Sequence, residues 1–309
     1  MDVSIFIPTY NGGDIFKECM NMVFKQKTSF PYEVICIDSE SSDGTLEVCE
    51  KYKVRTYAIE KKRFNHGLTR NKGVELAKGK YIVLMTQDAV PANEHWLTNM
   101  IKNFEDELVA GVYCRQIPRY DADVLTKQVL NDWLTGRLER DVKYLHDRTE
   151  YEKLPPMEKY KFCNFDNVCS CIRKSVWEKI PFDEADFGED LIWSKKVLLA
   201  GYKIIYEPSA VVIHSHNRSL VYEYKRAYIC NRRLYHLFRL QSIPTFSHVL
   251  KGYHWNLKKW FPYIKHEKNL LKKYKLYLKL LVFSFLSLYA QYKGALDEKN
   301  KKPQKAMKI

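Results

Sequence analysis

The chain has 309 residues, of which 46% are apolar, and this excludes a disordered protein and allows one large domain with a smaller appendage. The formal net charge of +14 is unevenly distributed: residues 217–309 contain 21 Lys and Arg and 4 Asp and Glu, whereas the preceding residues contain 30 and 33. A near-neutral body followed by a strongly basic tail predicts contact with a polyanion, either a nucleic acid or an anionic membrane.

The N-terminus and the cysteines indicate the compartment. Met1 is followed almost at once by an apolar strand pattern, without a basic region or a cleavage site, so we expect no signal peptide. The eight cysteines lack the spacing of metal ligands, because Cys169 and Cys171 are too close together and no second pair follows. Scattered free thiols are typical of a reducing cytosol.

Apolar strands alternate with amphipathic helices through residue 90. The pattern predicts strands over 3–8, 32–38, 54–59 and 81–85, and helices over 14–25, 45–52 and 68–77. This alternation favours an α/β fold with a mostly parallel sheet flanked by helices. Ligands in such sheets bind beyond the carboxyl ends of the strands.

The remaining elements are mixed. Residues 120–147 are predicted to be helical, 182–190 to be an acidic loop, 191–200 a helix, and 203–206 and 210–213 two strands. From residue 220 the pattern is helical, and from 298 it is Lys-rich and predicted to be disordered. We therefore expect a domain over 1–220, a helical, basic and aromatic region over 221–297, and a disordered tail over 298–309.

Several candidate ligand-binding residues stand where the predicted strands end. Pro8, Thr9, Tyr10 and Asn11 follow the first strand, and Asp38 ends the second, shortly before Ser41. A carboxylate at the position of Asp38 can accept hydrogen bonds from a nucleoside base or from ribose hydroxyls. The alternative is that Ser41 and its neighbours only cap a turn before the next helix.

Two further sites suit a metal ion and a general base. Asp88 follows the fourth strand, where a carboxylate can bind Mn²⁺ or Mg²⁺. His214 and His216 follow a late strand and share one of its faces, and one of them is a second candidate ligand. Glu189 and Asp190 precede a helix, and either carboxylate can take a proton from an acceptor hydroxyl. The alternatives are a turn-capping Asp88, a histidine without a metal role, and two acids that only stabilise a helix start.

Four basic or imidazole side chains are candidates for contacts to phosphate or sugar. They are Arg63, His66, Arg70 and Arg115. Arginine binds phosphate oxygens through two N–H groups at once, and Gly67 beside His66 allows a close backbone approach. Surface ion pairs and a simple turn are the alternatives for these positions.

The order of these segments resembles glycosyltransferase family 2. The resemblance covers roughly residues 1–220 and is carried by 5–13 (IFIPTYNGG), 37–45 (IDSESSDGT), 70–73 (RNKG) and 188–193 (GEDLIW) with 201–202 (GY). Within the family the sequence is most similar to bacterial rhamnosyltransferases, through 64–71 (FNHGLTRN), 84–91 (LMTQDAVP), 110–119 (AGVYCRQIPR) and 214–217 (HSHN).

This resemblance implies a GT-A fold and an inverting, single-displacement transfer of L-rhamnose from dTDP-L-rhamnose. Asp190, or else Glu189, is implied as the base, and the strand-end residues with Gln87 as the donor site. The family's Asp-x-Asp motif appears here as Thr86-Gln87-Asp88, so that only its second acid remains. The metal, Mn²⁺ or Mg²⁺, is then expected on Asp88 and His214, with metal dependence that is weak.

The basic region interleaves aromatic, Leu and Lys side chains, for example over 255–261 and 270–279. Such helices suit an anionic membrane interface, and the apolar run over 280–290 is about half the ~20 residues that span a bilayer. We expect a peripheral enzyme on the inner face of the cell membrane, a lipid-linked glycan acceptor and no nucleic acid. The alternatives are an ordinary packed bundle, a UDP-sugar donor, a nucleic-acid-binding protein and a non-catalytic sugar-nucleotide binding module.

Overall fold

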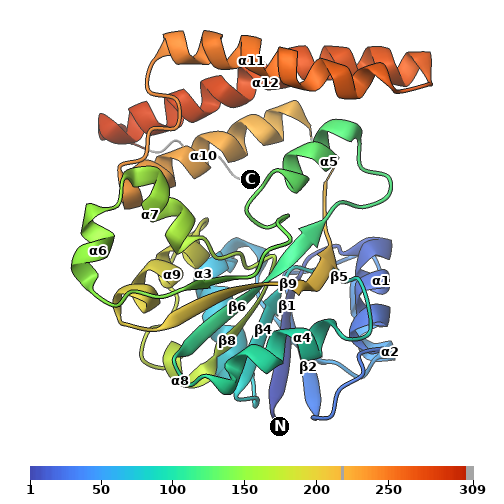
Figure 1. Ribbon diagram of the computed structural model, residues 1–309. Helices are drawn as coiled ribbons and strands as arrows, with labels where there is room; N and C mark the ends of the chain where they lie inside the picture. Colours follow the sequence, from blue (N-terminus) through green and yellow to red (C-terminus); the bar gives the residue numbers. More distant parts are fainter. Residues whose placement is uncertain (217–218, 304–309) are drawn as a thin grey trace. The chain divides into compact units, whose positions relative to one another are not determined.

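The computed structural model describes residues 1–216 and 219–303, and these form two compact units (Figure 1). The first unit comprises residues 1–119, 130–153 and 162–215, and the second comprises 120–129, 154–161 and the chain from 216 onward. The end of the predicted disordered tail, residues 304–309, lies outside the described residues, whereas residues 298 and 299 belong to a helix.

The first unit is built on a single sheet with the strand order β3-β2-β1-β4-β8-β6-β9-β5, in which β7 also pairs with β9. The strands are β1 Val3–Thr9, β2 Tyr32–Asp38, β3 Arg55–Ala58, β4 Tyr81–Met85, β5 Val90–Pro91, β6 Val109–Ile117, β7 Asp141–Lys143, β8 Cys169–Arg173 and β9 Lys203–Ile213. The predicted α/β class is confirmed, with β1 to β4 parallel. The sheet as a whole is mixed, because β8 runs antiparallel to both β4 and β6.

Helices surround this sheet (Figure 1). They are α1 Gly13–Val23, α2 Thr45–Lys51, η1 Lys61–Arg63, α3 His66–Leu76, α4 Trp96–Ile101, η2 Lys102–Glu105, α6 Arg148–Lys153, α8 Lys174–Trp177 and α9 Glu189–Leu199. Alternate strand residues such as Ile5 and Val83 pack with Phe16 of α1 and Trp96 of α4 in one apolar core. On the opposite face α3 approaches β1 closely, since a Cβ atom added to Gly73 would lie 2.5 Å from the ring of Phe6.

Two predicted elements after residue 110 are corrected by the structure. Residues 120–147 are not one helix: α5 (Val124–Asn131) ends early, and β7 joins the sheet beside β9. Gly136 lies so close to the Leu130 carbonyl oxygen that a Cβ atom would be 2.4 Å away, which indicates a tight turn. The two strands predicted over 203–213 form the single strand β9, and its register with β6 shifts between Cys114 and Arg115.

The second unit is helical, as the sequence predicts. It is built from α10 (Leu220–Phe238), α11 (Phe246–Lys265) and α12 (Leu270–Lys299), and it includes residues 156–161 of α7 (Pro156–Cys163). The three long helices begin at polar residues whose side chains accept a backbone N–H: Ser219, Thr245 and Asn269. Leu125 packs with α11 and α12 in a small apolar core. Over the described part of the chain, every helix is too short or too polar to cross a membrane.

Candidate active site

Asp38, the last residue of β2, is buried and ties together the segments that follow β1 and β2. Its Oδ1 accepts hydrogen bonds from Thr9 Oγ1 at 2.8 Å and from Ser41 Oγ at 2.6 Å, and its Oδ2 accepts one from the Ser41 backbone N–H at 2.8 Å. A carboxylate has about four lone-pair positions, so most of its accepting capacity is used inside the protein. Pro8 and Thr9 are held beside it because β1 and β2 are paired in register.

The loop after β1 also contacts the segment after β4. Tyr10 and Gln87 exchange two hydrogen bonds of 2.9 Å, from the Tyr10 N–H to Gln87 Oε1 and from Gln87 Nε2 to the Tyr10 carbonyl. Asn11, whose φ of +45° is a conformation that Asn tolerates, accepts from the Ser42 N–H at 2.8 Å and donates its own N–H to Ser41 Oγ at 2.9 Å. The structure thus brings the residues predicted at three strand ends to one edge of the sheet.

Asp88 and His214, the two predicted metal ligands, lie beside each other. The distance from His214 Nε2 to Asp88 Oδ1 is 3.7 Å, and both side chains are partly buried. They meet because β5 pairs with the end of β9, Val90 opposite Ile213. Bonds from a metal to a His nitrogen or a carboxylate oxygen are about 2.1 Å long, so two atoms 3.7 Å apart can bind one divalent ion. Of the two ligands, the carboxylate is the one that suits Mn²⁺ or Mg²⁺.

His214 has a further partner that the sequence did not single out as a site residue. Its Nδ1 lies 3.1 Å from Oε1 of Gln116, whose Nε2 donates to Asp166 Oδ2 at 2.8 Å. Asp166 precedes β8, and its neighbour Asn167 contacts the acids at the start of α9. A polar run, Asp166-Asn167, directly before an apolar strand is the one sequence signal that was available for these residues.

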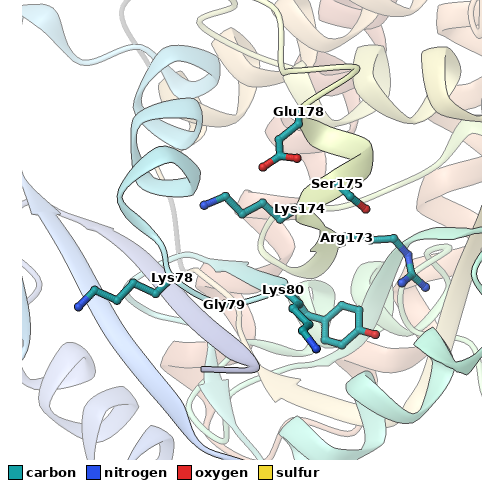
Figure 2. A pocket seen from close by; sticks show the side chains of 8 residues that line it. Lys78, Gly79, Lys80, Arg173, Lys174, Ser175 and Glu178 are labelled. Carbon is teal, nitrogen blue, oxygen red and sulfur yellow. The ribbon is translucent and has the colours of Figure 1, made fainter.

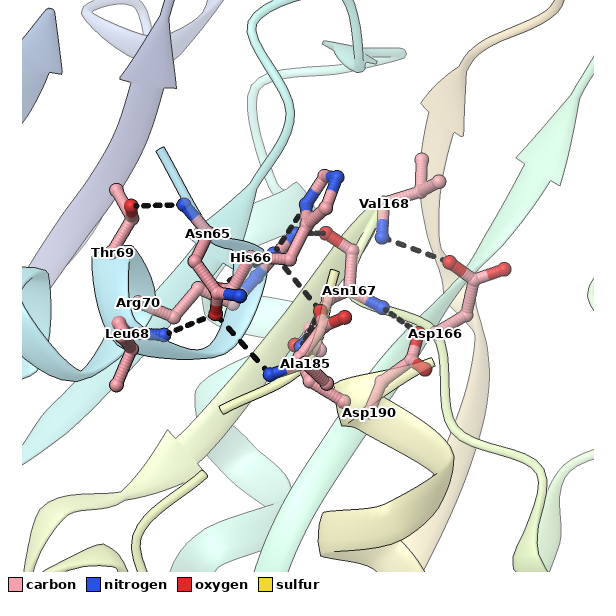
Figure 3. A network of polar contacts seen from close by, with 12 residues as sticks. Asn65, His66, Leu68, Thr69, Arg70, Asp166, Asn167, Val168, Ala185 and Asp190 are labelled. Carbon is pink, nitrogen blue, oxygen red and sulfur yellow. Dashed lines mark hydrogen bonds and ion pairs between the residues drawn. The ribbon is translucent and has the colours of Figure 1, made fainter. Parts of the chain in front are cut away.

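Glu189 forms an internal ion pair with Arg70, which Figure 3 shows among its polar neighbours His66 and Asn167. Arg70 Nη1 lies 2.9 Å from Glu189 Oε1, and both side chains are only 5% exposed. Asn167 Nδ2 donates to the same oxygen at 3.1 Å. Burial alone would raise the pKa of Glu189, but Arg70 and His66 outweigh it and hold that pKa below its ordinary value. Glu189 is therefore a buried carboxylate that balances the charge of Arg70.

Asp190 is half-buried, whereas its neighbour Glu189 is buried. Its Oδ2 accepts from the Asn167 backbone N–H at 3.3 Å, and its Oδ1 accepts from the Leu191 N–H at 2.8 Å. Burial, followed by the negative charges of Glu189 and Asp166, raises the pKa of Asp190 well above its ordinary value. A raised pKa makes the ionised carboxylate a stronger base, which is the property that general-base catalysis requires.

Arg63 and Arg115, two of the residues predicted to contact the donor, make contacts within the protein. Arg63 lies exposed on η1 and pairs with Glu60 at 3.4 Å, whereas Lys61, which sequence reasoning missed, donates to Tyr10 Oη at 2.5 Å. Arg115 donates from Nε to the Gly136 carbonyl at 3.3 Å.

His66 and Arg70 are close to each other, and their predicted donor contacts remain predictions. Arg70 Nη1 lies 3.2 Å from His66 Nδ1, and burial, followed by the charge of Arg70, lowers the pKa of His66. At Gly67 an added Cβ atom would lie 1.8 Å from the Asp183 carbonyl oxygen, so this close approach is made to the protein's own backbone.

A cavity of about 380 Å³ lies at the amino-terminal end of β4, the opposite end from Asp88 (Figure 2). Its lining includes Lys78, Lys80, Arg173 and Lys174. Arg173 already donates to three backbone carbonyls, and Lys174 Nζ donates to one. Arg173 and Lys174 are therefore already used in hydrogen bonds within the protein. The cavity is separate from the residues at the carboxyl ends of the strands.

Comparison with known proteins gives the family of this chain. The family described as Glycosyl transferase family 2 matches residues 4–180. The O-antigen chain rhamnosyltransferase RfbN of Salmonella typhimurium is 33% identical over 230 residues, which cover 73% of this chain and 70% of the relative. The O-antigen chain rhamnosyltransferase WbaN of Salmonella anatum is 32% identical over 230 residues, which cover 72% and 69%.

Solved structures are similar in fold. The mannosyltransferase PcManGT from Pyrobaculum calidifontis, in complex with GDP-Man and Mn²⁺, has a TM-score of 0.60 at 18% identity and covers 97% of this chain and 88% of its own. S. aureus TarS 1-349 in complex with UDP-GlcNAc has a TM-score of 0.51 at 16% identity, over 97% and 92%. These likenesses show the predicted GT-A fold. The family match spans the loops that follow β1, β2 and β4, and both Salmonella relatives are about a third identical to this chain over the 230 aligned residues. This chain therefore belongs to glycosyltransferase family 2 and is a glycosyltransferase similar to bacterial O-antigen chain rhamnosyltransferases.

Proposed function

We propose that the protein transfers L-rhamnose from dTDP-L-rhamnose to a lipid-linked or polysaccharide acceptor during synthesis of a cell-surface glycan, with inversion at the anomeric carbon. The names of the two Salmonella relatives support the sugar and the pathway class. The observation that carries the catalytic role, against a non-catalytic binding module, is the environment of Asp190. It is a half-buried carboxylate with a raised pKa beside a buried, charge-balanced Glu189.

Asp190 acts as the general base in this proposal. Its carboxylate takes the proton of the acceptor hydroxyl while the acceptor oxygen forms a bond to the anomeric carbon and the bond to the diphosphate oxygen breaks. Glu189 remains ionised against Arg70 and keeps the start of α9 in place. A single displacement of this kind needs no covalent intermediate on the protein.

The donor is held by the strand-end loops. Thr9, Tyr10 and Asn11, with Asp38 and Gln87, surround the nucleoside diphosphate, while Asp88 and His214 hold Mn²⁺ or Mg²⁺. His216, two residues further along the chain, is a candidate third ligand. When bound, the cation neutralises charge on the departing dTDP. The 3.7 Å separation of the Asp88 and His214 atoms supports this assignment.

A donor screen tests the proposal. Purified protein is incubated with Mn²⁺ and with dTDP-, UDP- or GDP-sugars, and both donor hydrolysis and the melting temperature are measured. A ligand that binds only the folded state raises the melting temperature. We expect dTDP-L-rhamnose to give the largest shift and the fastest hydrolysis. Preference for a UDP-sugar would establish the alternative donor, and no response to any sugar nucleotide would contradict the proposed function.

The second unit is proposed to bind the inner face of the cell membrane. It exposes large apolar side chains along α11 and the first half of α12, among them Trp255, Phe261, Leu270, Leu271 and Tyr274. The same segments carry many lysines, and amphipathic basic helices of this composition bind anionic lipid surfaces. Such a position places the enzyme where a lipid-linked acceptor is found.

A further inference from the structure

Gln116 of β6 is buried between one of the proposed metal ligands and an acid. Its side-chain Nε2 donates to Asp166 Oδ2 at 2.8 Å, and its Oε1 lies 3.1 Å from His214 Nδ1. The second oxygen of Asp166, Oδ1, accepts from the Val168 backbone N–H at 2.8 Å. Both oxygens of this carboxylate thus act as acceptors within the protein.

These contacts determine where the protons lie. A carboxylate accepts but cannot donate, so Gln116 must turn its NH₂ group toward Asp166 and its carbonyl oxygen toward His214. A carbonyl oxygen also only accepts, so Nδ1 of His214 must carry a hydrogen. In the neutral imidazole the lone pair is then on Nε2, the nitrogen that lies 3.7 Å from Asp88 Oδ1.

We propose that Gln116 and Asp166 are positioning residues that hold His214 in the Nδ1–H tautomer, so that Nε2 is ready to bind a divalent cation together with Asp88. The inference deepens the proposed function and rests on its cation site. Free histidine in water favours the opposite tautomer, with the hydrogen on Nε2. Without Gln116, the ring would have to move this proton before Nε2 could bind a metal.

The tautomer can be observed directly in the metal-free protein. Protein labelled with ¹⁵N-histidine is examined by long-range ¹H–¹⁵N correlation NMR at a pH where the ring is neutral, and His214→Gln identifies the resonance. We expect the Nδ1–H pattern for His214 in the wild type. Gln116→Met, which is similar in size but cannot accept from the ring, should shift it to the Nε2–H form.

Cation affinity is the second measurement, made by titrating Mn²⁺ and following the free ion by electron paramagnetic resonance. Loss of a hydrogen-bond partner behind a metal ligand typically lowers affinity about 10–100-fold, and we expect a loss in this range for Gln116→Met. The matched control is Gln26→Met. Gln26 is also a buried glutamine with both ends of its amide bonded, to Asn93 and Leu97, in the same unit. Its loss should leave Mn²⁺ affinity and the His214 tautomer unchanged.

Asp166→Asn is a milder variant in case Gln116→Met does not fold. Asparagine has one side-chain oxygen and one NH₂ group, so it can accept a hydrogen bond from Val168 or from Gln116 but not from both through separate oxygens. If its oxygen faces the Val168 N–H, its NH₂ group faces Gln116, and the Gln116 amide is no longer forced into one orientation. We expect both His214 tautomers and a smaller loss of Mn²⁺ affinity.

Two outcomes would overturn the inference: an Nε2–H tautomer in the wild type, or wild-type Mn²⁺ affinity in Gln116→Met. A wild-type protein that binds no divalent cation would instead contradict the cation site of the proposed function, and the NMR measurement on metal-free protein would still decide the tautomer.

Discussion

At the start of α9, the carboxylates of Glu189 and Asp190 are neighbours in the sequence and occupy different environments. Glu189 faces Arg70 and Asn167 in the interior, and Asp190 is half-buried beside Asp166. Arg70 and His66 hold the pKa of Glu189 down against its burial, while burial and two neighbouring acids raise that of Asp190. Two identical functional groups are thus separated into a structural acid and a candidate base.

The first prediction concerns that base. Asp190→Asn is nearly isosteric but cannot take a proton, and loss of a general base typically costs about 10²–10⁴-fold in rate. We expect kcat to fall by this factor, while the affinity for dTDP stays close to that of the wild type because the base faces the acceptor. Steady-state kinetics with dTDP-L-rhamnose and an acceptor checks it.

Glu189→Gln is the matched comparison for this variant. It leaves the buried guanidinium of Arg70 without a counter-charge, and breaking a buried pair in this way destabilises proteins by roughly 3–5 kcal/mol. Chemical denaturation should show this loss. A Glu189→Gln enzyme of normal stability but greatly reduced kcat, together with an active Asp190→Asn enzyme, would assign the base to Glu189 instead.

The second prediction is a pH dependence. Asp190 must be ionised to accept a proton, and its pKa is raised above the ordinary value for Asp, so kcat/KM should fall as the pH drops through this higher pKa. The acid limb of the profile should therefore lie at higher pH than an exposed aspartate would give. Asp166→Asn removes one of the charges that raise this pKa, so the limb should move to lower pH. A limb that stays in place or moves upward would contradict the assignment.

At the scale of elements, α10 and α12 are in close contact at Gly294. A Cβ atom added there would lie 2.3 Å from the carbonyl oxygen of Tyr228, which is backbone and cannot rotate away. Nearby, Tyr228 Oη donates to Asp297 Oδ2 at 3.0 Å, and Arg232 pairs with Glu298 at 2.8 Å. The glycine lets two helices approach closely enough to make these polar contacts.

The third prediction follows from this contact. In an open helix Gly→Ala stabilises by up to about 1 kcal/mol, but Gly294→Ala should lower the free energy of unfolding, because overpacking typically costs about 1–3 kcal/mol. Denaturation monitored by circular dichroism checks the sign. The control is Gly252→Ala in α11, where the added Cβ would be 3.2 Å from Cδ1 of Leu288, a side chain that can move. A stabilised Gly294→Ala protein would show that α10 and α12 can separate freely at this point.

For the whole molecule, the distribution of charge is the property that matters. The net positive charge lies after residue 216, where 21 Lys and Arg outnumber 4 Asp and Glu, in the unit that also exposes Trp255, Leu270 and Leu271. Each Lys or Arg near an anionic surface contributes about 1 kcal/mol, and this attraction weakens as salt screens it. Deleting the region from residue 250 would remove α12 and with it the contacts that α10 makes to Gly294, Asp297 and Glu298. Point variants are therefore the better test of membrane binding.

The fourth prediction is that the protein sediments with vesicles containing phosphatidylserine and less with neutral vesicles, and that salt releases it. Changing Trp255, Leu270 and Leu271 together to Gln should weaken this binding at least about tenfold, because their apolar surface no longer enters the interface. Leu108→Gln with Leu138→Gln, two exposed leucines of the first unit, is the control and should bind like the wild type. Salt-insensitive vesicle binding, or binding to nucleic acid alone, would contradict the membrane assignment.

Much of the fold could be predicted, because strands such as β2 and β4 are apolar runs bounded by polar turns, and both were predicted at their observed limits. The prediction of a helix over 120–147 was wrong, because β7 is stabilised by pairing with β9, a partner more than fifty residues away along the chain. Lys61 and Gln116 were missed as site residues for the same reason. Their partners Tyr10 and His214 are distant in the sequence, so no local pattern marks them.

The sequence by itself determined the family, the α/β class, the loops at the strand ends and the basic character of the C-terminal region, because each depends on the order and spacing of residues along the chain. Only the tertiary structure decided that the ionised Glu189 pairs with Arg70 while Asp190 stays half-buried. It also decided that Gln116 contacts both Asp166 and His214. Burial and charge pairing between distant segments control the pKa and the proton positions of these groups, and such pairing exists only once the sheet has formed.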